Sequence, residues 1–159
     1  MTTLPPSPGV ACQRGVTLVE LMVAIAILGI LLSLAAPSFS VVIENQRAKA
    51  AAADLYTSLV RARSEAIKRN TSMSLTPKGA GWGSGWQMTD PVSAVVIEDH
   101  GAIQGLTLSG PAGVTYRSSG RIAGDAQVSF GISGDHSSSA RCVRLDLSGR
   151  PAIGSGACS

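Results

Sequence analysis

The distribution of apolar and polar residues divides the chain into three regions. In the first, Glu20 is the only charged residue between Arg14 and Glu44, and residues 21–43 contain no charge at all. About 20 apolar residues in a helix are enough to cross a bilayer. This stretch therefore predicts a membrane-spanning helix, in which Gly29 and Pro37 are expected to bend or locally melt the backbone.

The second region, residues 39–70, predicts an amphipathic continuation of the same helix. Apolar residues recur there at steps of three and four: Leu55, Leu59, Ala62 and Ala66. This spacing places them on one face of a helix, which needs a partner surface. The charged residues lie largely outside that face and are interpreted as solvated, with Glu65 and Arg69 forming a favourable pair four residues apart.

The third region begins at residue 71 and consists of short apolar stretches separated by Gly, Ser, Pro and Asp. Eight of them predict strands: residues 72–77, 86–90, 94–99, 106–110, 114–118, 126–132, 140–147 and 150–154. Turn residues at their ends favour antiparallel pairing. We therefore predict an α+β fold, in which a long N-terminal hydrophobic helix continues into an amphipathic helix packed on one or two small antiparallel sheets.

Cysteine positions and net charge add two constraints. The chain carries +3 at pH 7, and this weak excess does not by itself indicate a nucleic-acid partner. Cys12 precedes the apolar stretch, whereas Cys142 and Cys158 follow it. A membrane crossing would put Cys12 in a different redox compartment, so we expect a disulfide between Cys142 and Cys158.

Catalytic and metal-binding patterns find little support, so we expect neither an enzyme nor a bound metal or cofactor. His100 and His136 have no nucleophile motif or ligand spacing around them. An acid/base pair of His100 with Glu98 or Asp99 is an alternative, less favoured than a polar loop. The stretch "GDHSSSA" around His136 is interpreted as a flexible turn.

Two further stretches contain residue types that often mark binding sites. "GAGWGSGW" has several glycines but precedes a predicted strand, so it lacks the helix N-terminus that holds phosphate. Trp82 and Trp86 are interpreted as buried anchors of the sheet and not as binding aromatics.

Glu20 poses a separate question, because a carboxylate within apolar surroundings is costly unless it is paired. The stretch "RGVTLVELMVAIAIL" resembles the N-terminus of type IV pilins and pseudopilins. The resemblance implies that residues 1–15 are a leader that prepilin peptidase removes after Gly15, and that Val16 becomes the methylated first mature residue. Glu20 would then be an assembly residue, paired with the N-terminal amine of a neighbouring subunit. A secretory signal peptide and a plain membrane anchor are the alternatives, but neither explains Glu20.

Three more stretches narrow the resemblance to the FimT and type II secretion H group of minor pilins and pseudopilins: "LVRARSEAIKRNTSMSL", "GWGSGWQM" and "SGRPAI". The resemblance implies a leader (1–15), a transmembrane and assembly helix (16–38), its amphipathic continuation (39–70) and a β-rich head (71–159). It also implies a subunit of a type IV pilus or type II secretion pseudopilus, anchored once in the bacterial inner membrane with its head in the periplasm. The implied partners are other pilins or pseudopilins, prepilin peptidase, the inner-membrane assembly platform and the membrane itself.

The alternative function is DNA uptake. FimT-like proteins that take up DNA carry Gly-Arg-x-Arg near the C-terminus; here Gly149 and Arg150 match, but Ala152 replaces the second arginine. Other arginines could join Arg150 in a basic patch: Arg117, Arg121, Arg141 and Arg144. Because Asp135 and Asp146 lie in the same region, we predict weak binding without sequence specificity at most, with Arg150 as the main contributor.

Overall fold

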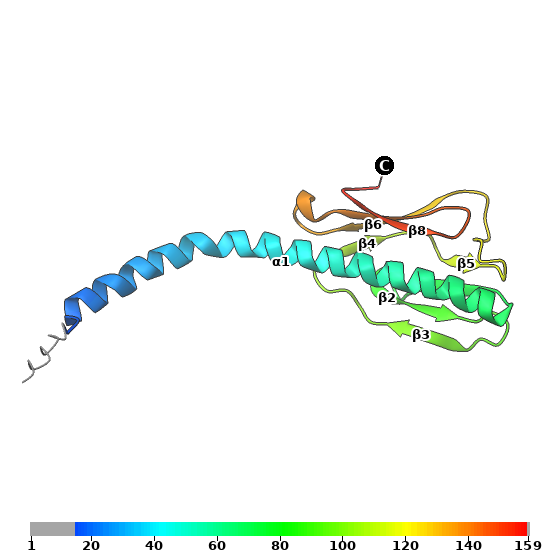
Figure 1. Cartoon of the computed structure of the whole chain (residues 1–159), viewed down its shortest axis with the longest axis horizontal. Helices are drawn as coiled ribbons and strands as arrows, with labels where there is room; N and C mark the ends of the chain where they lie inside the picture. Colours follow the sequence, from blue (N-terminus) through cyan, green and yellow to red (C-terminus); the bar gives the residue numbers. More distant parts are fainter. Residues whose placement is uncertain (1–14, 159) are drawn as a thin grey trace, which may run out of the picture. The chain divides into compact units, whose positions relative to one another are not determined.

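The computed structural model describes the backbone of residues 15–158 and their side chains except at 34–38 (Figure 1). The predictions for the leader, Arg14 and Cys12 lie outside the described residues. The chain divides into two compact units, Met1–Pro37 and Ser38–Ser159. We call the second unit the head and describe each unit by itself.

A single helix, α1 (Leu18–Arg69), contributes to both units. Its first turn is capped by Thr17, whose Oγ1 accepts a hydrogen bond from the backbone N–H of Glu20 at 3.2 Å. This is the usual role of a threonine just before a helix. The backbone is helical through Gly29 and Pro37, so the local melting expected there is not seen; a glycine costs a helix only about 1 kcal/mol. None of the helices within residues 15–158 has both the length and the apolar character needed to cross a membrane.

Within the head, α1 buries one face against the sheets. Its buried residues follow the predicted helical spacing: Ala48, Ala51, Ala52, Leu55, Leu59, Ala62 and Ala66. The helix ends as Asn70 adopts a positive φ of 50°, and Thr71 donates its backbone N–H to the Ala66 carbonyl at 3.2 Å. This left-handed cap satisfies carbonyls that the last turn would otherwise leave unpaired.

Two four-stranded antiparallel sheets complete the head, and their strands correspond to the eight predicted stretches. The strands are β1 (Met73–Lys78), β2 (Gly81–Thr89), β3 (Val96–His100), β4 (Thr107–Ser109), β5 (Val114–Tyr116), β6 (Val128–Ser133), β7 (Arg141–Leu145) and β8 (Pro151–Ser155). The first sheet has the order β3-β2-β1-β5 and the second has β4-β6-β7-β8. A short 3-10 helix, η1 (Ser137–Ser139), lies in the connection between β6 and β7. The predicted α+β fold is confirmed.

Aromatic side chains join the helix and the sheets in one core. Trp82 and Trp86 are 3% and 0% exposed, so the prediction that they are buried anchors is confirmed. The Trp86 indole N–H donates to Ser58 Oγ of α1 at 2.9 Å. Trp82 packs edge-on against Phe130 of the second sheet, with ring centroids 4.9 Å apart. Both indole rings therefore contribute to the apolar core and are not available as binding platforms.

Candidate functional site

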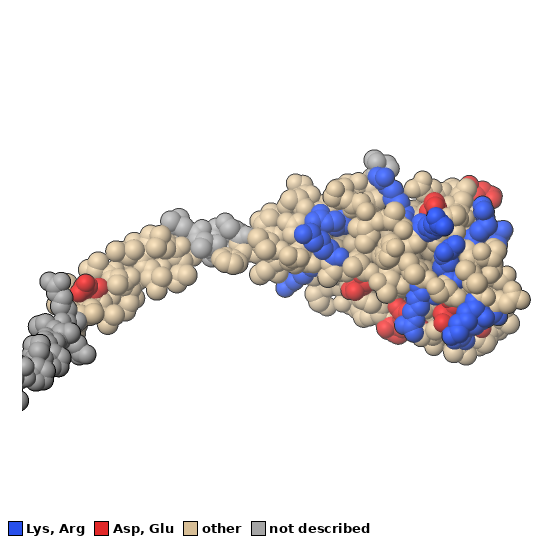
Figure 2. Space-filling model, viewed as in Figure 1, with Lys and Arg blue, Asp and Glu red and all other residues tan. Residues whose placement is uncertain are grey.

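The predicted processing and assembly residues lie in an exposed, apolar part of the first unit. Gly15 has no neighbour within 4 Å of where a Cβ would stand, and Val16 is 72% exposed. The large apolar side chains of α1 from Leu18 to Leu32 are all more than half exposed. The described part of this unit is correspondingly almost free of charge in Figure 2. A helix that is apolar on all sides needs an external partner to cover it.

Glu20 is exposed and has no partner for its carboxylate within residues 15–158. Its backbone N–H is engaged by the Thr17 cap. A negative charge in the first turn also interacts favourably with the helix dipole. The described residues of the first unit contain no Lys, Arg or His, so any cation that pairs with the Glu20 carboxylate comes from outside them.

A second carboxylate, Glu44, joins α1 to the connection between β6 and β7. Glu44 Oε1 accepts the backbone N–H of His136 at 2.9 Å and the hydroxyl of Ser139 at 2.6 Å. Its Oε2 lies 2.9 Å from His136 Nδ1. Gly134 is required beside it, because a Cβ at this position would collide with the Glu44 carboxylate. We call Glu44, His136 and Ser139 the Glu44 latch.

These hydrogen bonds change the acidity of Glu44. The hydroxyl of Ser139, followed by the side chain and backbone of His136, lowers the pKa of Glu44 from 4.5 to about 2. Hydrogen bonds donated to a carboxylate favour its charged form. The latch is therefore held by an ionised carboxylate at neutral pH, and "GDHSSSA", interpreted from the sequence as a flexible turn, contains the short 3-10 helix η1 and these hydrogen bonds.

Sequence reasoning missed the Glu44 latch because Glu44 and His136 are 92 residues apart, and no local spacing reveals the contact. The available signals were Gly134 and the isolated charge of Glu44 at the end of the apolar stretch. Neither of these identifies a partner.

The other histidine does not form the acid/base pair considered from the sequence. His100 stacks on Trp86, with ring centroids 4.0 Å apart, and its Nε2 lies 3.6 Å from Asp54 of α1. Its neighbours are engaged elsewhere: Glu98 accepts the hydroxyl of Ser58 at 2.6 Å. Since successive residues of a strand point to opposite faces, Asp99 lies away from both. We find no group of three potential metal ligands within the described residues.

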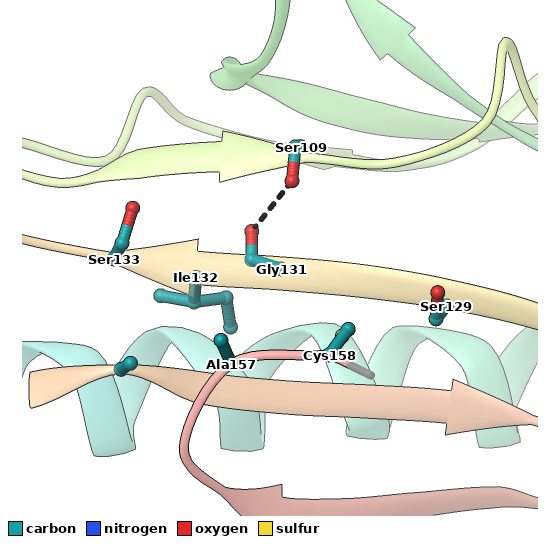
Figure 3. A pocket seen from close by; sticks show the side chains of 8 residues that line it. Ser109, Ser129, Gly131, Ile132, Ser133, Ala157 and Cys158 are labelled. Atoms are coloured by element: carbon teal, nitrogen blue, oxygen red, sulfur yellow. Dashed lines mark hydrogen bonds between the residues drawn. The ribbon is translucent and has the colours of Figure 1, made fainter.

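The predicted disulfide is present. Cys142 and Cys158 are bonded, with their Cα atoms 5.1 Å apart. The bond holds the C-terminal segment beside the second sheet, next to a hollow of about 270 Å³ (Figure 3). Ser109 of β4, Gly131 of β6 and Ala157 are among the residues that line this hollow. None of its lining residues is charged, so the hollow offers no acid, base or metal ligand.

The five arginines proposed for DNA binding divide into separate groups. Arg117 and Arg121 close one turn, with a 2.8 Å hydrogen bond from the Arg117 N–H to the Arg121 carbonyl. Arg150 closes a second turn. This turn packs directly on the first, so closely that a Cβ at Gly149 would strike the carbonyl of Gly120. Arg141 instead donates to Asn45 of α1 at 3.3 Å, beside the Glu44 latch.

The fifth arginine, Arg144, lies on β7, and the acidic residue Asp146 follows it closely in the chain. Arg144 of β7 is exposed and pairs in register with Ala152 of β8. Asp146 shares the Arg150 turn, where hydrogen bonds from Ser148 and from the Arg150 N–H lower the pKa of its carboxyl. Lysines and arginines are interspersed with acidic residues on the face shown in Figure 2. The structure therefore brings together Arg117, Arg121 and Arg150, and separates Arg141 from them.

Comparisons with known proteins identify the class. Residues 51–149 match the family described as type II transport protein GspH. Residues 11–36 match the prokaryotic N-terminal methylation motif. Because the first match covers more than half of the chain, the chain belongs to the GspH family, and the resemblance predicted from the sequence is confirmed.

Individual relatives show the same class. The pilin-like protein PilA1 of Thermus thermophilus is 46% identical over 72 residues, which are 43% of this chain and 44% of that protein. The chain thus spans less than half the length of this curated relative.

Two solved structures share the fold. A crystal structure of the type IV minor pilin FimU of Pseudomonas aeruginosa has a TM-score of 0.64 at 21% identity, covering 70% of this chain and 90% of that one. The minor pseudopilin EpsH of the Vibrio cholerae type 2 secretion system has a TM-score of 0.55 at 14% identity, covering 69% and 97%. At these identities the likeness concerns the fold alone.

Proposed function

We propose that this protein is a minor pilin or pseudopilin, a structural subunit that assembles with related subunits into a type IV pilus or a type II secretion pseudopilus. The observation that carries the proposal is the exposed apolar helix of the first unit, in a chain that belongs to the GspH family and carries the methylation motif. Neighbouring helices of the same kind would cover this surface. The head offers no catalytic arrangement among its described residues.

The N-terminal residues have specific roles in this proposal. Prepilin peptidase cuts after Gly15, and Val16 becomes the methylated first residue. Its amine, with a reference pKa of about 7.7 to 8.0, supplies the cation for Glu20 of a neighbouring subunit. Before assembly, residues 16–38 anchor the chain once in the inner membrane, with the head in the periplasm. The inner-membrane assembly platform then extracts the subunit from the membrane into the filament.

Intact-mass analysis of the membrane-extracted protein tests the processing step. We expect the loss of residues 1–15 and the addition of one methyl group to Val16. A mature start near Ala36 would instead indicate an ordinary signal peptidase and would contradict the proposal.

Incorporation of a Glu20→Ala variant into filaments tests the pairing. We expect normal membrane insertion but strongly reduced incorporation, because the variant removes one partner of an ion pair in an apolar setting. Ser33→Ala is the matched control, since the Ser33 hydroxyl is already satisfied by the Ile30 carbonyl of its own helix at 2.7 Å. Normal incorporation of Glu20→Ala would show that the pairing is not needed.

DNA binding is a second candidate, carried by the two packed turns that present Arg117, Arg121 and Arg150. No side-chain hydrogen bond or ion pair engages these three arginines within the described part of the chain. If all three contact phosphates, the logarithm of the binding constant should fall with the logarithm of salt concentration with a slope of about −3.

Fluorescence anisotropy with the full chain in detergent tests this candidate. Arg150→Ala should weaken binding at low salt, whereas Arg69→Ala, whose guanidinium is paired with Glu65 at 2.6 Å, should not. No binding at low salt would leave assembly as the only supported role.

A further inference from the structure

The Glu44 latch lies near the start of the head part of α1, before the core begins. Within residues 39–158, Ala48 is the first buried residue; before it Val41 is half-buried, while Phe39, Val42 and Ile43 are exposed. Apolar burial therefore contributes little to holding this first part of the helix to the sheets. The polar contacts of Glu44 and Asn45 hold it there.

The connection that these residues hold is itself without apolar anchors. From Gly134 to Ala140 the only buried residue is Ser139, at 0% exposure. The Ser139 hydroxyl contacts Glu44, and its oxygen also accepts the backbone N–H of Gly134 at 3.2 Å. The connection is thus held by hydrogen bonds to the Glu44 carboxylate, together with one from Arg141 to the Ser138 carbonyl at 3.2 Å.

Asn45 adds a second contact from the next residue of α1. Its Oδ1 accepts from Arg141, whose guanidinium also reaches the Ala140 carbonyl at 2.6 Å. Arg141 begins β7, the strand that carries Cys142 and hence the disulfide. Two successive helix residues therefore connect α1 to the centre of the second sheet.

We propose that the Glu44 latch forms a separate cooperative unit of the head: when it opens, the β6–β7 connection and residues 39–47 of α1 detach together, while the core from Ala48 onward stays folded. Local opening of this kind is expected where a segment has few buried apolar contacts. In the proposed assembly function, on which this consequence rests, force applied to the N-terminal helix reaches the second sheet through the latch.

The charges around Glu44 support a latch that stays closed at neutral pH. His136 contacts it from the connection, where Asp135 is the preceding residue, Arg141 lies at the start of β7, and Arg47 follows on α1. The hydrogen bonds that hold the carboxylate ionised come from the connection itself. At neutral pH the latch is therefore expected to open under force or after mutation, and not by titration of Glu44.

Hydrogen–deuterium exchange of the full chain in detergent at neutral pH tests the proposal. Glu44→Gln should raise the exchange rates of peptides covering 134–140 and 39–47 by about tenfold or more, because the hydrogen bonds accepted by the carboxylate weaken when the acceptor loses its charge. Peptides covering β1 and β2 should keep their wild-type rates. Gly134→Ala should give the same pattern, since its Cβ would displace the Glu44 carboxylate without removing the charge.

Glu65→Gln is the matched control. Glu65 lies on the same helix, and its side chain is 16% exposed, against 13% for Glu44. Its partners, Arg69 and Lys68, belong to α1 itself. Glu65→Gln should therefore leave both reporter peptides unchanged.

Two results would overturn the proposal. Wild-type exchange in both latch variants would show that the carboxylate does not hold the connection. A uniform rise in all head peptides would show that the latch is part of the global core and not a separate unit. If Glu44→Gln and Gly134→Ala do not fold, Ser139→Ala is measured instead, since it removes one hydrogen-bond donor to Glu44. The same two results would then overturn the proposal. Filament assembly does not enter this measurement, so its result is independent of the proposed function.

Discussion

The two halves of α1 differ in how many apolar residues they carry and in how they bury them. From Leu18 to Leu32 every large apolar side chain is more than half exposed, whereas Leu55 and Leu59 in the head are 0% exposed. The sequence explains the difference. The first half is apolar on all sides and carries one charge, while the second concentrates its apolar residues on one face and its charges on the others.

This difference indicates where each half obtains its stability. The head half is covered by its own sheets, so its packing energy belongs to the folded subunit. The first half has no such cover within its own unit, so it depends on a membrane or on other subunits. Substitutions in the two halves should therefore affect different measurements, which the following predictions test.

The largest expected effect separates the two halves directly. Leu59→Ala should destabilise the head by about 2 to 5 kcal/mol, because it removes methyl groups from a filled core. Leu28→Ala, at a side chain that is 55% exposed, should leave head stability unchanged. Denaturant unfolding followed by tryptophan fluorescence measures this, since both tryptophans of the chain lie in the head. Equal effects of the two substitutions would contradict the division of α1.

Removing the disulfide should also affect the head alone. Cys142→Ser should lower the free energy of unfolding by about 3 kcal/mol, the chain-entropy value for a closed loop of roughly this length; the two cysteines are 16 residues apart. The same fluorescence measurement applies, and helix protection in residues 18–33 should not change. Cys12→Ser, outside the described residues, is the control that should have no effect on the head.

The parts that were predictable from the sequence depend on local patterns. The helix face and the eight strands follow from spacings of two, three and four residues, and the tryptophan anchors follow from the small number of aromatic residues in the chain. The assembly role of Glu20 also rests on a fixed distance along the chain, from Gly15, and stays a prediction. The Cys142–Cys158 pair followed from the position of the apolar stretch.

The parts that were not predictable depend on contacts between distant segments. The pairing of β5 with β1 and of β4 with β6 separates the strands into two sheets, and no local spacing specifies this choice. The contact of Glu44 with His136 spans 92 residues. The clustering of Arg150 with Arg117 and Arg121, apart from Arg141, likewise depends on how the turns pack.

Acid should lower the stability of the head, because it protonates the Glu44 carboxylate of the latch. Glu44 has a pKa of about 2 in the fold against an ordinary value of 4.5. Its contribution to stability is thus fully present above pH 4.5 and is lost as the pH falls towards 2. Wild-type protein should be more stable than Glu44→Gln at neutral pH, and the two should converge in this acidic range.

Other carboxyls with lowered pKa values, those of Glu65, Asp90 and Asp146, titrate in both proteins. The difference between the two denaturation midpoints therefore isolates Glu44. A difference that stays constant from neutral pH down to pH 2 would contradict its role.

The smallest expected effect concerns a polar group that the head leaves unsatisfied. The hydroxyl of Tyr116 is buried without a hydrogen-bond partner among the described residues, and burial raises its pKa well above the ordinary value. Tyr116→Phe keeps the ring and removes the unpaired hydroxyl, so it should stabilise the head by about 1 kcal/mol. Tyr56→Phe, at a residue that is 37% exposed, is the control and should change little. Denaturant unfolding measures both, and a loss of stability in Tyr116→Phe would show that a bound water satisfies the hydroxyl.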